Sequence, residues 1–388
     1  MHDAEMKSLP SAPDKALGRP PSWARRLYLV LPTSVAGAVL CGQMLVAAVD
    51  PYNLYPWSPA REINEDAAVE LSPYLLRAVR RGNVDTVLIG GSTSLDIAAS
   101  DIERLIEGTE KAVNLSYRAT RGADLGVVFK EVSDAANVRR VILFLDWIYL
   151  RPDAEKNPAF PFHLYEGDPT EALFRIDRQA YELSFRLLTS GRLVIGGTTR
   201  AERNHWRDVK YREWHSARSV TRERAMIEAE RLRVGEPTDI TCADLGAIET
   251  RLAPFARALS AAGKRLDVIV PPYAMSYYHW VLRRKSDILF RPRASLDSAL
   301  VMRRCALEVL APLEGVDVYA FDGERWLTDD LANYRDAAHV QNEDAFRFML
   351  EAVNAGRNRL TLDNFDAYAR DLRERVPAYA YRSSLQQE

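Results

Sequence analysis

Five short apolar runs that alternate with longer amphipathic segments constrain the fold most. Short runs of this kind are typical of strands buried on both faces, and strands separated by helices form parallel sheets. We therefore expect an α/β domain over residues 84–357, with a parallel sheet at its centre. The runs are DTVLIG (85–90), KAVNLS (111–116), RRVILFLDW (139–147), RLDVIVPPY (265–273) and GVDVYAF (315–321). The expected helices cover 66–81, 98–107, 121–136, 241–262, 294–312 and 342–356.

A second long feature is the uncharged segment LYLVLPTSVAGAVLCGQMLVAAV, residues 27–49. About 20 apolar residues suffice to cross a bilayer as a helix. Lys and Arg residues precede the segment and Asp50 follows it, so the positive-inside bias predicts a cytoplasmic segment 1–26 and an extracytoplasmic remainder. A signal peptide cleaved after Ala48 and a buried core helix are the alternatives. The apolar core of a signal peptide normally has about 7–15 residues, which favours an uncleaved single-pass anchor.

The remaining segments divide the chain further. Residues 50–83 form a linker, rich in Pro and Tyr at its start, that carries the leading helix. The alternating pattern breaks over 150–236, which predicts a helical insertion or cap. Its charged residues form either a solvated helical face or a surface that presents arginines to an anionic glycan or to lipid headgroups. Residues 358–388 are polar, and we expect a loosely packed or unpacked C-terminal tail.

Composition excludes some partners and leaves others open. The net charge of −2 gives no indication of a nucleic-acid partner, and no Cys/His cluster has the spacing of metal ligands, so no metal or cofactor is expected. A Cys242–Cys305 disulfide and two separate buried thiols are equally compatible with the sequence.

Ser92 stands at the carboxyl end of the first expected strand, where ligands bind in open parallel sheets. A serine hydroxyl needs a base to become a nucleophile, and that base needs a group to orient it. His339 and Asp336 in NYRDAAHV provide such a pair, with His339 three residues after Asp336. Two structural alternatives stay open: Ser92 caps the following helix, or Asp336 caps the last helix beside a surface histidine.

Five further stretches can be taken together with these residues: DPYNLY, VLIGGSTS, NLSYRAT, VILFLDW and VYAFDGERWLTDDLANYRDAAHV. These motifs resemble the SGNH (GDSL-type) esterase and acyltransferase superfamily over roughly residues 84–357. Within it, the chain is similar to membrane-anchored bacterial members associated with cell-envelope polysaccharides. The resemblance implies a three-layer α/β/α sandwich with a flavodoxin-like sheet, and a triad of Ser92, Asp336 and His339. Ser94 is a second candidate for the nucleophile.

The resemblance also implies oxyanion and substrate-binding positions at Gly91, Asn114, Ala119 and Asp146. Ala119 stands where many members carry a glycine whose N–H binds the oxyanion, and any residue except proline supplies that donor. Asp146 stands where hydrolases of the family carry a donor Asn. An ionised carboxylate accepts hydrogen bonds and repels an oxyanion, and loss of one such donor typically costs about 10²–10³ in rate.

The function that follows is that of an extracytoplasmic serine esterase or O-acyltransferase of the bacterial inner membrane. It would add or remove acyl groups, most simply acetyl, on an exported or cell-envelope polysaccharide. An acyltransferase of this type would need a multi-spanning membrane partner that brings acyl groups outward. The alternative is a non-catalytic SGNH-like binding or scaffold component of a polysaccharide export assembly.

Overall fold

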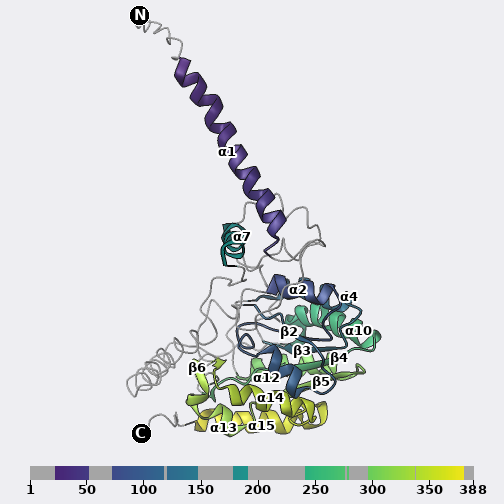
Figure 1. Cartoon of the computed structure of the whole chain (residues 1–388). Helices are drawn as coiled ribbons and strands as arrows, with labels where there is room; N and C mark the ends of the chain where they lie inside the picture. Colours follow the sequence, from purple (N-terminus) through teal and green to yellow (C-terminus); the bar gives the residue numbers. More distant parts are fainter. Residues whose placement is uncertain are drawn as a thin grey trace, which may run out of the picture.

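A computed structural model describes residues 22–51, 72–117, 120–146, 178–190, 241–275, 278, 296–336 and 338–379. At its centre is a five-stranded parallel sheet with the strand order β2-β1-β3-β4-β5 (Figure 1). Each of the five apolar runs contains one strand, so the expected α/β class and parallel sheet are confirmed. The strands are β1 (Thr86–Ile89), β2 (Ala112–Asn114), β3 (Arg140–Phe144), β4 (Arg265–Val270) and β5 (Val316–Ala320).

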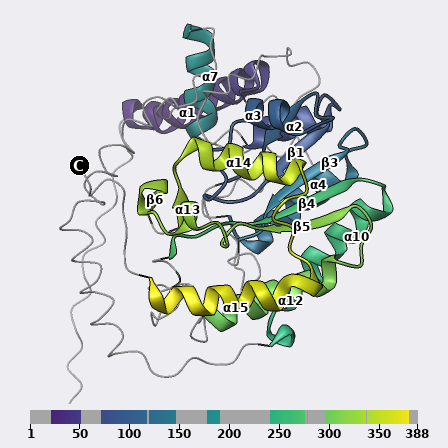
Figure 2. The same cartoon turned by 90° about the horizontal axis from the view of Figure 1, so that it is seen from below.

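The strands are buried on both faces because helices cover each face. Successive side chains of a strand point to opposite sides, and in β1 Val87 and Ile89 enter one apolar cluster whereas Leu88 enters the other. Figure 2 shows α14 on one side of the sheet and α12 and α15 on the opposite side. One cluster draws on α2 (Ser72–Arg80), α4 (Gly122–Asp134), α10 (Ala253–Ala261), α12 (Leu296–Leu310) and α15 (Leu362–Ala378), and the other on α3 (Ala99–Leu105), α13 (Arg325–Thr328) and α14 (Glu343–Asn354).

The helix expected over 241–262 is interrupted. A 3-10 turn, η2 (Cys242–Asp244), is followed by a π-helical segment, η3 (Ile248–Leu252), before α10 begins. Pro254 lies in the first turn of α10, and a proline has no N–H with which to continue the preceding helical ladder. The wider π turn lets the N–H of Ala253 reach the carbonyl of Ile248 instead.

The prediction of a loosely packed tail over 358–388 is wrong for most of that segment. Residues 362–378 form α15, which packs against α12 and the core. Its buried apolar residues recur at helical spacing among charged ones, so a narrow stripe faces the core although the segment as a whole is polar. The stripe consists of Phe365, Ala369, Leu372 and Val376. Residues 380–388 lie outside the described residues.

The N-terminal helix α1 (Ser22–Val49) projects away from the α/β domain (Figure 1). Its residues Val30–Val49 are long and apolar enough to cross a membrane, with a mean hydropathy of 1.7. Of the expected insertion, the structure describes α7 (Arg178–Ser190), which packs against α1. The rest of that insertion and residues 52–71 of the linker lie outside the described residues.

Cys242 and Cys305 form a disulfide that joins η2 to α12, with a Cα–Cα distance of 5.5 Å. Of the two alternatives that the sequence left open, a disulfide and two separate thiols, the structure has the disulfide. It ties the chain that returns from the insertion to a helix of the core.

Candidate active site

The strand order places a topological switch point between β1 and β3. β2 lies on one side of β1, and β3, β4 and β5 follow on the other. In sheets of this order, ligands bind outside the carboxyl ends of the strands at the switch point. Ser92 follows β1 at that edge, and Asp146 follows β3. The sheet therefore brings these two sequence-predicted positions to the same edge.

Ser92 contacts His339 directly, across 247 residues of sequence. The distance from Ser92 Oγ to His339 Nε2 is 2.8 Å, and both residues are half-buried. This is the geometry that a nucleophile and its general base require. A neutral imidazole that carries its proton on Nδ1 accepts the serine proton at Nε2.

Gly90 permits the tight approach of the loop that carries Ser92. A Cβ atom at position 90 would lie 2.1 Å from Ser94 Oγ and 3.0 Å from Phe144 Cβ. Both neighbours are buried, so a larger residue would push the loop away from β3. Glycine is needed here for close packing of the chain rather than for a positive φ.

The structure separates the two serines that the sequence offered. Ser94 is fully buried, and its hydroxyl contacts Ser116 Oγ at 2.8 Å and the carbonyl oxygen of Gly91 at 3.2 Å. Ser92 is half-buried and contacts the imidazole. Ser94 thus holds the loop together, whereas the hydroxyl of Ser92 faces His339.

Neither of the two capping alternatives describes the structure. Helix α3 has Ala98 at its N-cap and no side-chain capping bond, so Ser92 does not cap it. Helix α14 is capped by Asn342, whose side chain accepts a hydrogen bond from the N–H of Asp344 at 2.9 Å. Asp336 therefore does not cap α14, the helix that follows the Asp-x-x-His motif.

Asn114 supports the loop from β2. Its Nδ2 donates to the carbonyl oxygens of Ser94 and Ile97, both at 2.9 Å, and its Oδ1 accepts from the N–H of Ser116 at 2.9 Å. Both amide protons are thus used within the protein. In this structure Asn114 fixes the loop that carries Ser92.

A short antiparallel hairpin carries the Asp-x-x-His motif. Asp336, at the end of β6 (Tyr334–Asp336), pairs through its backbone with His339, at the start of β7 (His339–Val340). The spacing of three residues therefore corresponds to the two sides of a tight turn. The side chain of Asp336 lies outside the described part of the chain.

Asn333 clamps this hairpin to the preceding loop. Its side chain donates to the carbonyl oxygens of Trp326 and Leu327 at 2.7 and 3.2 Å, and accepts from Asn342 Nδ2 at 2.8 Å. Its own carbonyl accepts from the N–H of Gln341 at 2.8 Å. These bonds fix the chain on both sides of His339, at Asn333 before it and at Gln341 and Asn342 after it.

A buried ionic cluster, which the sequence analysis missed, anchors the loop after β5. We define it as Asp322, Arg303, Tyr278 and Tyr368. Asp322 is fully buried and accepts from both tyrosine hydroxyls, at 2.7 Å from Tyr368, while Arg303 Nη1 lies 3.1 Å from its carboxylate. Burial, together with the neighbouring Asp322, raises the pKa of Tyr278 well above its usual value.

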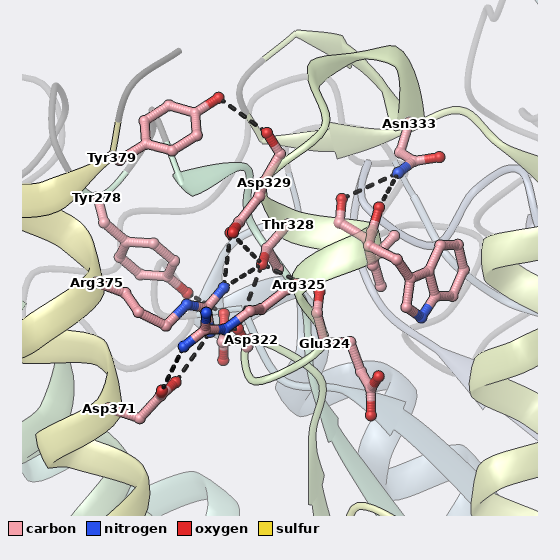
Figure 3. A network of polar contacts seen from close by, with 12 residues as sticks. Tyr278, Asp322, Glu324, Arg325, Thr328, Asp329, Asn333, Asp371, Arg375 and Tyr379 are labelled. Atoms are coloured by element: carbon pink, nitrogen blue, oxygen red, sulfur yellow. Dashed lines mark hydrogen bonds and ion pairs between the residues drawn. The ribbon is translucent and has the colours of Figure 1, made fainter. Parts of the chain in front are cut away.

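Arg375 of α15 extends this support (Figure 3). It donates to the carbonyl oxygen of Asp322 at 2.8 Å, to Thr328 Oγ1 at 2.9 Å and to the carboxylates of Asp329 and Asp371 at 2.7 and 2.9 Å. Burial opposes its charge, but the two carboxylates outweigh burial and raise its pKa. The C-terminal helix thus holds the loop that leads to His339. No local sequence pattern marks the buried ionic cluster, since its residues come from four separate segments: the loop after β4, α12, the loop after β5 and α15.

Of the remaining predicted positions, the structure describes Gly91 and Asp146. Gly91 is buried, and its carbonyl accepts from Ser94. Asp146 is half-buried after β3, and its N–H donates to the carbonyl of Phe144 at 3.1 Å. Ala119 and the histidines other than His339 lie outside the described residues. Among the described residues, no group of three or more metal-ligating side chains is assembled.

Comparison with known proteins does not assign the chain to a family. No protein-family model matches it, and no curated protein matches it.

Proposed function

We propose that the protein is a serine esterase or O-acyltransferase whose nucleophile is Ser92 and whose general base is His339. The 2.8 Å contact between Ser92 Oγ and His339 Nε2 carries the proposal. The strand order and the helices on each face are compatible with the three-layer α/β/α sandwich of SGNH enzymes.

In the first half of the reaction, Ser92 Oγ attacks the carbonyl carbon of an acyl ester while His339 Nε2 accepts the hydroxyl proton. That proton passes to the leaving oxygen, which departs as an alcohol and leaves an acyl-serine. In the second half, water or a sugar hydroxyl attacks the acyl-serine and gives its proton to His339. The proton returns to Ser92 Oγ as the acid or the new ester leaves.

Asp336 would orient the imidazole. Directly paired residues of an antiparallel hairpin carry their side chains on the same face, with Cβ atoms about 4.5–5.5 Å apart. The pairing of Asp336 with His339 supports this role. A carboxylate at His339 Nδ1 would hold the tautomer that leaves Nε2 free to accept a proton.

The backbone N–H of Ser92 would bind the developing oxyanion. Among the described residues it donates no hydrogen bond, so it remains available to a substrate oxygen. In the family that the sequence resembles, Ala119 would supply the second donor. Gly91 and Asn114 would act by holding the loop.

We place this activity outside the cytoplasm, on a carbohydrate substrate. The span Val30–Val49, the basic residues before it and the Cys242–Cys305 disulfide support an anchored, extracytoplasmic domain. The acyl group would be acetyl, and the acceptor or donor an envelope or exported polysaccharide. Transfer would require a multi-spanning membrane partner that delivers the acyl group.

A second candidate function is a non-catalytic binding or scaffold role in polysaccharide export. Asp146 favours it, because a carboxylate stands at the edge of the sheet where a hydrogen-bond donor would stabilise an oxyanion. Under this alternative, the Ser92–His339 contact would be structural.

A fluorophosphonate probe distinguishes the two functions, because it labels only an activated serine. We expect the detergent-solubilised full chain to be labelled, and both Ser92→Ala and His339→Ala to abolish labelling. Ser100→Ala is the matched control and should retain it, since Ser100 is exposed on α3, eight residues beyond Ser92. Absence of labelling in the unmodified chain between pH 6 and 9, with the fold intact by circular dichroism, would support the scaffold role.

A further inference from the structure

Helix α7 has an exposed apolar sector that no described part of the chain covers. Phe185 and Leu188 are 65% and 59% exposed, although both are large apolar residues. They lie three residues apart, so both project to one side of the helix. Water is an unfavourable environment for such a surface.

The other sides of α7 are already assigned. Ala180 and Ser184 are buried, and Ala180 belongs to the same apolar cluster as Val46 of α1. The contact is close, because a Cβ atom at Gly42 would lie 2.5 Å from the ring of Tyr181. Polar residues border Phe185: Arg178 and Thr189 lie seven and four residues from it and so share its side of the helix, and Arg178 pairs with Glu182 at 2.8 Å. The exposed apolar residues of α7 thus lie between its face on α1 and this polar border.

The position of α7 along α1 suggests what covers the apolar face. Gly42 lies seven residues before the end of α1, which is about 10 Å along the helix axis. Amphipathic helices at a membrane surface bury their apolar face about 5–10 Å below the headgroups. Figure 1 shows α7 nearly end-on and Figure 2 shows it lengthwise, so it crosses α1 rather than running beside it. A helix that crosses a membrane-spanning helix at this depth lies in the plane of the bilayer surface.

We propose that α7 is an interfacial membrane helix that inserts Phe185 and Leu188 into the lipid around α1. The inference rests on the proposed anchoring by α1, whose exposed apolar side chains, including Leu40 and Met44, continue the same lipid-facing surface. The insertion would hold the α/β domain at a fixed distance from the membrane. A single helix followed by a linker would not do this.

Spin labels test the proposal in the full chain, reconstituted in vesicles of phosphatidylethanolamine and phosphatidylglycerol. Cys41, the free cysteine of the described residues, is first replaced by Cys41→Ser, and the bonded pair Cys242–Cys305 does not react. Labels are then introduced by Phe185→Cys, Leu188→Cys and, as the matched control, Glu182→Cys, which is exposed and lies six residues from Leu188, on a different side of the helix. Gly37→Cys marks the lipid interior, since no atom lies within 4 Å of a Cβ there.

Collision with oxygen and with a water-soluble nickel chelate is measured by power saturation. We expect oxygen to exceed the chelate several-fold at positions 37, 185 and 188, and the chelate to dominate at 182. Equal access of the chelate at 188 and 182 overturns the proposal. Exclusion of both reagents at 185 also overturns it, because a protein partner or a second copy would then cover the face.

Two further readouts separate possible causes of failure. Access of the chelate at position 37 shows that α1 does not span the bilayer, and the inference then fails with the anchoring on which it rests. Fluorophosphonate labelling of Ser92 in the same vesicles reports the proposed chemistry independently. Melting followed by circular dichroism confirms that each labelled variant is folded.

Discussion

At the scale of single residues, the loop after β1 leaves no room for change at its first position. Gly90 lies against Ser94 and Phe144, both of which are buried. Ser94 in turn bonds to Ser116, and Asn114 holds the loop from β2. The position of the Ser92 hydroxyl is therefore set by neighbours that take no part in the proposed chemistry.

Gly90→Ala should lower the free energy of unfolding by about 1–3 kcal/mol, because the added methyl forces Ser94 or β3 to move. Urea unfolding followed by circular dichroism measures the change. Gly126→Ala, in the middle of α4, is the control: no atom lies within 4 Å of its Cβ, so a gain of about 0.5–1 kcal/mol is expected. Equal effects at the two positions would contradict the packing argument.

At the scale of elements, the hairpin β6–β7 depends on parts of the chain that are remote in sequence. The buried ionic cluster joins α12, α15 and the loops after β4 and β5. Arg375 of α15 holds the loop between β5 and the hairpin. The segments that position His339 therefore include the helix that was expected to be a tail.

Asp322→Asn should destabilise the protein by about 3–5 kcal/mol, because it leaves the buried charge of Arg303 without its partner. Glu308→Gln on the same helix as Arg303 is the control. Glu308 pairs with Arg304 at the surface, at 3.1 Å, and such pairs contribute about 0–1 kcal/mol. Urea unfolding of both variants gives the comparison, and a loss below 1 kcal/mol for Asp322→Asn would refute the role of the cluster.

Alkaline pH should weaken the same cluster. The phenol of Tyr278 has a raised pKa in the folded protein, whereas its unfolded value is about 10. Above pH 10 the unfolded chain therefore binds fewer protons, and stability falls as pH rises, by at most about 1.4 kcal/mol per pH unit for this group. Below that pH the contribution is fully present. Tyr278→Phe should make the loss of unfolding free energy between pH 10 and 11 less steep, and an unchanged slope would contradict this assignment.

At the scale of the whole molecule, a disulfide and a helix–helix contact connect the α/β domain to segments outside it. The disulfide closes a loop of 63 residues that contains β4 and part of the chain returning from the insertion. Helices α1 and α7 pack on each other, and Val46 of α1 and Ala180 of α7 belong to an apolar cluster of the domain core. The domain is thus tied to its own insertion and to the N-terminal helix.

Loss of the disulfide should cost about 4 kcal/mol by the chain-entropy estimate for a loop of this length. The paired variant Cys242→Ser/Cys305→Ser removes it without leaving a free thiol, and Cys41→Ser is the matched control with no expected loss. Thermal and urea unfolding, each with and without reductant, measure the change. A stability of the unmodified chain that is insensitive to reductant, with both thiols shown to be free, would refute the bond.

The sequence by itself determined the five strands, because a strand buried on both faces must be apolar along its whole length and short. It also indicated Ser92, His339 and the Asp336 spacing, since a strand end and a tight turn are local features. Tertiary structure alone buried Ser94 and brought Ser92 to His339, paired Cys242 with Cys305, and folded α15 onto the core. It also assembled the cluster around Asp322. These outcomes depend on contacts between segments that lie tens to hundreds of residues apart, and the free energy of such contacts arises only when packing brings the segments together.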